Sequence, residues 1–190
     1  MPRRYTNFSQ DHYYHIFNRG ADKQKIFYEQ ENYSYFLRLL KPLVKHYNFN
    51  MIVYCLMPNH FHFLIKLNEN LNVGSFMSRF LDSYVTAFNN RYNRSGFLFK
   101  ERYKSILVEK EEYLKYLCRY IHRNPLKANL VNKIEQWPWS NYFECVGERT
   151  GCLCDKNFII SCFSSQKQYK EFVLDNDDSY PDDFDKFIFE

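Results

Sequence analysis

The sequence predicts an α+β fold: a ferredoxin-like antiparallel sheet with helices on one face, plus an extra C-terminal helix. The main observation is the hydrophobic pattern, which switches between a period of two, typical of strands, and a period of three to four, typical of helices. The predicted elements follow the order β-α-β-β-α-β-α, and the first six match the split βαβ arrangement. We therefore expect the second face of the sheet to stay open.

The first four predicted elements end in a β-hairpin. A strand is expected at residues 13–18 (YYHIFN), and a helix at residues 32–47, where apolar side chains recur every three or four positions. Residues 51–56 (MIVYCL) are apolar on both faces, which indicates a covered strand. A tight turn (MPN) then leads into a strand that starts at His60.

The remaining three predicted elements are a helix, a strand and a final helix. Residues 73–92 predict a long helix whose aromatic side chains repeat every four positions, and core packing is favoured for this stripe over base stacking. Residues 103–108 (YKSILV) predict the next strand. Residues 111–123 predict the last helix, and Pro125 is expected to end it from just beyond.

The composition indicates one soluble domain. The chain has 190 residues, of which 45% are hydrophobic, enough for a sizeable core. It has no apolar run long enough to span a bilayer, and its start, MPRRYTNFSQ, lacks the apolar segment of a secretory signal, so a cytoplasmic location is expected. The six cysteines fit a reducing compartment. A zinc knot is left open, although the spacing is not a standard zinc pattern: Cys145, Cys152, Cys154 and Cys162.

The charge is unevenly distributed along the chain. The net charge is +4, but residues 175–190 contain seven acids and one base, a net of −6, which leaves +10 on residues 1–174. A basic body rich in aromatic residues is the usual footprint of a nucleic-acid-binding protein. A solvated basic surface is the alternative, and charge alone does not exclude it.

The strand that starts at His60 carries the first candidate site. Side chains alternate faces along a strand, so His60 and His62 would share one face and the neighbouring phenylalanines the other. Neutral imidazole is the commonest metal ligand in proteins, and two imidazoles at this spacing can reach one ion. A pair of hydrogen-bonded surface histidines is the alternative. His15 could approach His60 across the sheet, but a core histidine is favoured there.

The predicted last helix carries two stripes. The first is apolar and faces the core: Leu114, Leu117, Cys118 and Ile121. In the second stripe Tyr113 and Tyr116 are interpreted as packing residues. Tyr120 and Asn124 follow on that stripe and are neighbours on the helix surface, because they are four residues apart. Asn124 can offer a carbonyl oxygen to a hard divalent cation, and Tyr120 a phenolic oxygen. His122 lies on another face and is expected to be exposed.

Five separated segments resemble the single-tyrosine HUH transposases, and most closely the branch associated with repetitive extragenic palindromes (REP). The segments appear in the order typical of that family and cover roughly residues 13–145: YHIFNRG (14–20), LMPNHFHFLIK (56–66), GFLFKERYKSILV (96–108), RYIHRNPLKANLV (119–131) and WPWSNY (137–142). The resemblance implies a transposase domain at residues 1–145 and a C-terminal extension packed on it at residues 146–174. An acidic tail follows at residues 175–190.

The resemblance also implies the roles of individual residues. His60 and His62 match the two HUH metal ligands, Asn124 the third, amide-type ligand, and Tyr120 the nucleophile. The implied activity is that of a metal-dependent single-stranded DNA endonuclease and strand transferase, with Mg²⁺ or Mn²⁺ as cofactor. It cleaves near DNA hairpins through a covalent 5′-phosphotyrosine. No membrane partner is implied, and a monomer is favoured with a dimer left open. Three basic residues are candidates for contacts with the DNA backbone: Arg19, Arg102 and Lys104.

Two other function classes compete with this one. A catalytically silent nucleic-acid-binding module with the same fold would stack bases on aromatic side chains of an open sheet face. Here that face would carry the histidines, and no RNP-type signature is present. A histidine-triad nucleotide hydrolase needs a third histidine two residues beyond His62, where the chain has Leu64.

Overall fold

Four antiparallel strands form one sheet in the order β2-β3-β1-β4. The structure is a computed structural model and describes residues 7–151, 153, 155–175 and 179–188. The strands are β1 (Tyr13–Arg19), β2 (Phe49–Met57), β3 (His60–Leu67) and β4 (Lys104–Val108). With α1 (Gln30–His46) between β1 and β2, and α2 (Val73–Arg91) between β3 and β4, the first six elements give the predicted ferredoxin-like arrangement.

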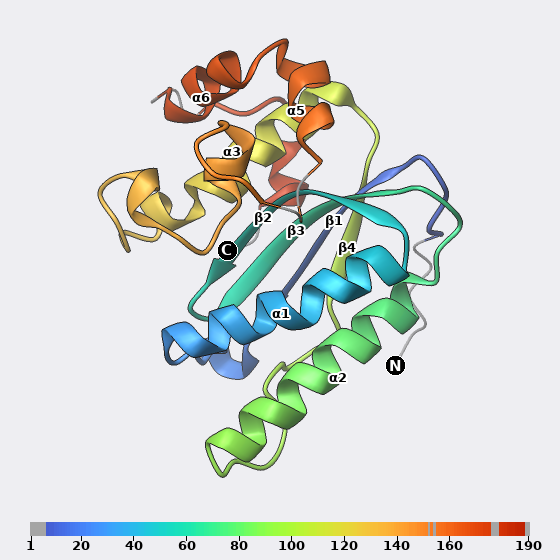
Figure 1. Cartoon of the computed structure of the whole chain (residues 1–190), viewed down its shortest axis with the longest axis vertical. Helices are drawn as coiled ribbons and strands as arrows, with labels where there is room; N and C mark the ends of the chain where they lie inside the picture. The colour runs from blue at the N-terminus through green and yellow to red at the C-terminus, as the bar shows by residue number, and fades with distance from the viewer. Residues whose placement is uncertain (1–6, 152, 154, 176–178, 189–190) are drawn as a thin grey trace.

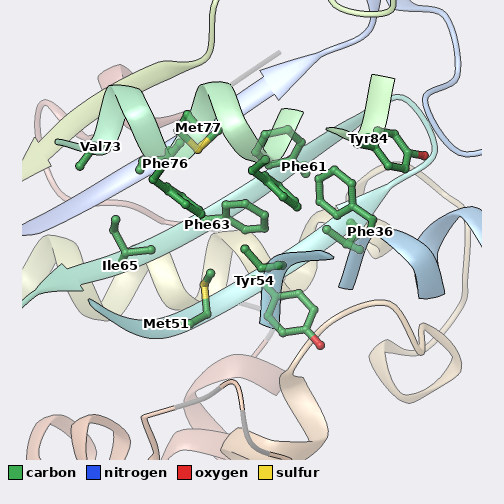
Figure 2. Close-up of a cluster of buried hydrophobic side chains, with 14 of the residues drawn as sticks. Phe36, Met51, Tyr54, Phe61, Phe63, Ile65, Val73, Phe76, Met77 and Tyr84 are labelled. Carbon is green, nitrogen blue, oxygen red and sulfur yellow. The ribbon is translucent and has the colours of Figure 1, made fainter. Parts of the chain in front are cut away.

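The first face of the sheet is covered by α1 and α2 (Figure 1). Figure 2 shows the hydrophobic cluster between these layers, where Phe36 of α1 packs on Phe63 of β3. Phe36 also packs on Phe80 of α2. All three side chains are fully buried. Burying a phenylalanine side chain contributes roughly 1.5–3 kcal/mol to folding. This layer therefore makes the hairpin that carries the histidines a rigid part of the fold.

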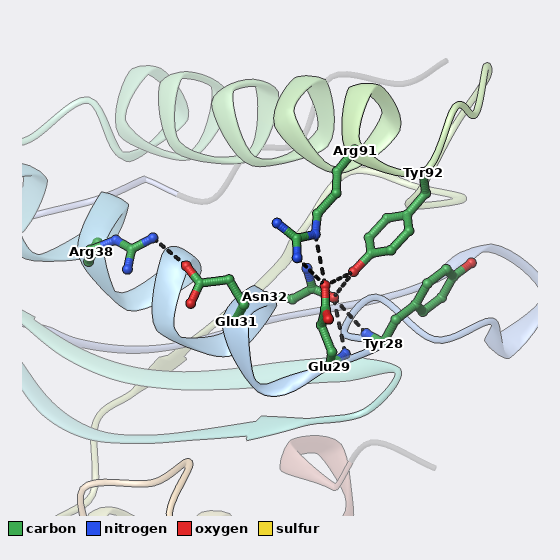
Figure 3. Close-up of polar contacts among 7 residues, drawn as sticks. All are labelled: Tyr28, Glu29, Glu31, Asn32, Arg38, Arg91 and Tyr92. Atoms are coloured by element: carbon green, nitrogen blue, oxygen red, sulfur yellow. Dashed lines mark hydrogen bonds and ion pairs between the residues drawn. The ribbon is translucent and has the colours of Figure 1, made fainter.

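The loop before α1 is tied to the end of α2 by polar contacts (Figure 3). The Glu29 carboxylate accepts hydrogen bonds from Arg91 Nε at 2.7 Å and from the Tyr92 hydroxyl at 2.6 Å. Asn32 Oδ1 accepts from the backbone N–H groups of Tyr28 and Glu29 at the start of α1. Exposed ion pairs contribute little stability, so the main effect of this cluster is to fix the path of the loop.

The second face of the sheet is covered by α3 (Glu111–Lys127), and this corrects the expectation of an open face. Leu117 and Ile121 of α3 are buried in one cluster with Leu64 of β3. His60 is 7% exposed and His62 is 0% exposed. The alternation along the strand correctly predicted that both histidines share the face opposite to α1 and α2. The apolar stripe of α3 packs on that same face and buries them.

The prediction that Pro125 ends the last helix is wrong, because α3 continues to Lys127. A proline in a helix removes one backbone hydrogen bond. Here the last turn is closed by other bonds, from Ala128 N to the carbonyl of Asn124 at 3.0 Å and from Leu130 N to that of Pro125 at 3.0 Å. Asn124 therefore lies within regular helix, one turn beyond Tyr120.

His122 is fully buried, which contradicts the expectation that it is exposed. Its Nε2 lies 3.0 Å from Asn141 Oδ1, and its Nδ1 lies 2.6 Å from the Tyr169 hydroxyl. Since the amide oxygen only accepts, Nε2–H donates to Asn141, and the neutral ring accepts from Tyr169. Asn141 Nδ2 also donates to the Ile52 carbonyl at 2.9 Å. This network joins α3 to the edge strand β2 and to the helix α6 (Gln166–Leu174), which carries Tyr169.

Residues 137–142 run along the outer edge of β2. Leu56 N donates to the carbonyl of Trp139 at 2.8 Å, and Cys55 and Ser140 form an antiparallel bridge. The described part also contains four helices of three or four residues: η1 (Ala21–Lys23), η2 (Ile134–Gln136), α4 (Tyr142–Cys145) and η3 (Phe184–Phe187).

The C-terminal segment packs on the outer side of α3. Its helices are α5 (Lys156–Phe163) and α6 (Gln166–Leu174). Arg119 and Arg123 of α3 each donate to the backbone carbonyl of Asp175 at 2.7 Å. Phe184 and Phe187 are buried against Tyr113. The division into a domain, an extension and an acidic tail stays a prediction.

Two further sequence expectations concern membrane-spanning helices and the cysteines. None of the helices within the described ranges is both long enough and apolar enough to cross a membrane. Three of the described cysteines are free thiols: Cys55, Cys118 and Cys162. The zinc knot considered above also needs Cys152 and Cys154, which lie outside the described residues.

Candidate active site

The turn before His60 is held by the loop that follows β1. Gly20 N donates to the carbonyl of Asn59 at 2.8 Å, and Ile26 N donates to that of Pro58 at 2.8 Å. A Cβ atom at position 20 would lie 2.2 Å from the carbonyl oxygen of Gln24, which only glycine avoids. The local sequence thus fixes the point at which the histidine strand begins.

His60 presents one nitrogen to the turn and the other to α3. Its Nδ1 lies 2.6 Å from Asn59 Oδ1, and its Nε2 lies 3.1 Å from Asn124 Oδ1. Both partners are amide oxygens, which only accept hydrogen bonds, and a neutral ring carries a single proton. We assign that proton to Nδ1, because its contact with Asn59 is the shorter of the two. The lone pair of Nε2 then faces the carbonyl oxygen of Asn124. Two acceptors brought together in this way form a suitable pair of cation ligands.

This spacing fits a bound divalent cation. Adjacent ligands of an octahedral ion with bonds of about 2.0–2.1 Å lie about 2.9 Å apart, close to the 3.1 Å between His60 Nε2 and Asn124 Oδ1. In the part of the chain that the structure describes, no group of three His, Cys, Asp or Glu side chains could hold a metal ion. A site with three protein ligands here therefore needs the amide oxygen of Asn124 beside the two histidines.

His62 lies next to His60 and deeper in the fold. The two rings are edge-to-face with centroids 5.0 Å apart. Burial lowers the pKa of His60 to about 4, against the opposing effect of the Asn124 amide oxygen, which favours the protonated ring. Burial, reinforced by the neighbouring His60, His15 and Arg19, lowers the pKa of His62 well below its usual value. Both imidazoles are therefore neutral near pH 7, the form that binds metals.

Tyr120 reaches the same place from α3. Its ring packs edge-to-face on that of His62 with centroids 5.6 Å apart, and the side chain is 3% exposed. The guanidinium of Arg19 interacts electrostatically with Tyr120, and Lys127 Nζ lies 5.9 Å from the centre of its ring. The structure thus brings together the four residues that the sequence singled out as ligands and nucleophile: His60, His62, Tyr120 and Asn124.

A basic groove with a volume of about 510 Å³ adjoins these residues. Arg19, which lines it, is paired with His60 across the β1–β3 ladder. We define the basic groove by its charged side chains: Arg19, Asp22, Lys23, Lys100, Glu101, Arg102 and Lys104. All three predicted DNA-contact residues are among them. Sequence reasoning missed Lys23, at the end of the short helix η1, and Lys100, before β4, because such short segments give no periodic signal.

The site thus combines neutral paired imidazoles on the sheet, a tyrosine on the helix that covers them, and an adjoining basic groove that suits a nucleic-acid backbone. The chain belongs to the IS200-like transposase family, whose family model, described as "Transposase IS200 like", matches residues 8–124. This match confirms the resemblance that the five segments indicated.

Two relatives agree with this assignment. A protein of Haemophilus influenzae that bears the name of a REP-associated tyrosine transposase is 27% identical over 113 residues, which are 54% of this chain and 64% of that protein. The match thus spans less than two thirds of the relative. The solved structure of a REP-associated tyrosine transposase bound to a REP hairpin superposes with a TM-score of 0.61 and 17% identity, covering 82% of this chain and 93% of that one. This likeness shows the shared fold.

Proposed function

We propose that the protein is a metal-dependent single-stranded DNA endonuclease and strand transferase that cleaves near DNA hairpins through a covalent 5′-phosphotyrosine. The observation that carries the proposal is the convergence of two distant segments of the chain: Tyr120 of α3 contacts His62 of β3, and Asn124 of α3 contacts His60 of β3. One copy of the chain contains all of these groups, which favours activity as a monomer. The solved relative with this fold binds a REP hairpin, which supports hairpin DNA as the partner.

His60, His62 and Asn124 would hold the metal, for which Mg²⁺ or Mn²⁺ is the candidate. When bound, such an ion neutralises the non-bridging oxygens of a phosphodiester and orients it. The basic groove would hold the DNA backbone by its lysine and arginine side chains. Arg19 belongs both to the groove and to the surroundings of Tyr120, so it would direct the scissile phosphate to the tyrosine.

Tyr120 would act as the nucleophile. Its deprotonated Oη attacks the phosphorus, a new O–P bond forms, and the bond from phosphorus to the 3′ oxygen breaks. The 3′ oxygen leaves and takes up a proton, while the 5′ side stays on Tyr120. The positive charge of Arg19 favours the phenolate form. Attack by a second 3′-OH on this phosphotyrosine reverses the step and joins new strands without an energy source.

The test is the formation of a covalent adduct. A hairpin oligonucleotide with single-stranded flanks and Mn²⁺ is expected to give a protein–DNA species that survives denaturing electrophoresis. Tyr120→Phe is expected to abolish it. Tyr116→Phe is the matched control, because Tyr116 lies one turn earlier on α3 and packs on Phe172 and Tyr180 instead. An adduct that persists in Tyr120→Phe would refute the assignment of the nucleophile. Binding without any cleavage by the wild-type protein would favour the silent module.

A further inference from the structure

A third buried histidine, His15, lies directly behind His62. Its Nε2 is 3.0 Å from His62 Nδ1, and the two rings are stacked with centroids 5.2 Å apart. His15 belongs to β1, where it is paired with Leu64 on β3, and its side chain is 0% exposed. The reaction proposed above assigns no role to His15.

An imidazole at position 15 destabilises the folded state if its role is only to fill the core. Its Nδ1 is buried and makes no hydrogen bond within the described ranges of the chain. A buried polar atom without a partner destabilises the folded state, whereas an apolar ring of the same shape would not. The ring of Phe17 lies beside His15, with centroids 4.7 Å apart, so an aromatic ring is compatible with the surroundings. The presence of an imidazole therefore points to a function of its nitrogen atoms.

The hydrogen bond between the two rings decides which nitrogen of His62 can bind a ligand. His62 Nδ1 faces His15, so only Nε2 can turn toward the site. When both rings are neutral, one of the two facing nitrogens carries a proton and donates it, and the other accepts. If His62 donates, its Nε2 keeps a lone pair. If His15 donates, His62 carries its proton on Nε2 and cannot bind a metal through that atom.

The neighbouring histidine shows the first of these arrangements. His60 donates its Nδ1–H to Asn59 and so presents an unprotonated Nε2 to Asn124. Metal-binding histidines generally donate their second N–H to such a partner, which fixes the tautomer and the ring orientation. We propose that His15 is a positioning residue that accepts the Nδ1–H of His62 and so holds the Nε2 of His62 unprotonated for the metal. The inference rests on the proposed metal site.

The first test determines the tautomer of His62 in the metal-free protein by nitrogen-15 NMR of the imidazole rings. In the wild-type protein we expect the Nδ1–H tautomer at His62 and a proton on Nδ1 of His15. A wild-type His62 that carries its proton on Nε2 would overturn the inference. In His15→Phe, which keeps a ring but no acceptor, we expect His62 to lose its preference for the Nδ1–H tautomer.

The second test measures Mn²⁺ affinity by the electron paramagnetic resonance signal of the free ion. We expect about 10- to 100-fold weaker binding in His15→Phe. His15→Gln, whose side-chain oxygen can still accept, should bind Mn²⁺ more tightly than His15→Phe and covers the case in which His15→Phe does not fold. His12→Phe replaces an exposed histidine before the same strand and is the control. Equal affinity in His15→Phe and the wild type would refute the inference, whereas a wild type with the expected tautomer but without Mn²⁺ binding would refute the metal-dependent activity.

Discussion

Asn141→Ala is expected to destabilise the protein strongly, because one side chain satisfies three buried polar groups. Asn141 is 0% exposed. Its Oδ1 accepts from Tyr54 N at 2.7 Å and from His122 Nε2 at 3.0 Å, and its Nδ2 donates to the Ile52 carbonyl at 2.9 Å. Each buried group left without its partner costs about 1–3 kcal/mol. The expected loss is therefore at least about 3 kcal/mol, near the upper end for a single substitution.

The assay for Asn141→Ala is urea denaturation, followed by far-ultraviolet circular dichroism. The free energy of unfolding is obtained by linear extrapolation at constant slope. Asn132→Ala is the matched control, because Asn132 lies on an exposed turn nearby, and its loss is expected to stay within about 0.5 kcal/mol. A loss of less than about 1 kcal/mol in Asn141→Ala would refute the view that this amide joins α3 to β2. The same variant should also lose adduct formation, because α3 carries Tyr120.

Three further predictions concern the loop, the basic groove and pH. Gly20→Ala forces a methyl group against the carbonyl of Gln24 and should lower both the unfolding midpoint in urea and the yield of covalent adduct; unchanged values would show that the loop does not hold the histidine turn. Lys100→Gln should weaken binding to all single-stranded sequences alike and reduce the salt dependence of log K by about 0.7, as expected for one lost phosphate contact, while Lys133→Gln outside the groove should not. Burial lowers the pKa of His122 to about 4 from about 6.5 in the unfolded chain, so its contribution to stability is complete above pH 6.5 and is lost as the pH falls toward 4. The loss amounts to about 3 kcal/mol, and urea midpoints between pH 7.5 and 4.5 should fall less steeply in His122→Gln than in the wild type.

The order of the elements could be predicted because it depends on local periodicity. The alternation of His60 with its apolar neighbours is a property of one strand, and the spacing of Tyr120 and Asn124 is a property of one helix. Neither pattern reports how the helix sits on the sheet. The covering of the histidine face by α3 and the burial of His122 depend on tertiary contacts, and sequence reasoning missed both. It also missed the continuation of the helix beyond Pro125, where other backbone bonds close the last turn.

In the candidate site, too, the residue types could be predicted from the sequence, whereas the contacts between distant segments could not. The ligand and nucleophile residues were predicted by their chemistry and by the resemblance to a family. The contact of His15 with His62 could not be predicted, because it requires the register of β1 on β3, and a shift of one residue would turn His15 to the other face. Lys100 likewise joins the basic groove only through the folding of the segment before β4.

The segment along the outer edge of β2 has a consequence for solubility. Exposed sheet edges can recruit strands from other molecules and so begin aggregation. Here residues 139–141 occupy hydrogen-bonding positions of β2, which leaves little of that edge for a foreign strand. The opposite edge, β4, is only five residues long and begins with Lys104, and a short strand with a charged end is a poor template for such growth. A chain as rich in apolar strands as this one is thus protected against self-association at both sides of its sheet.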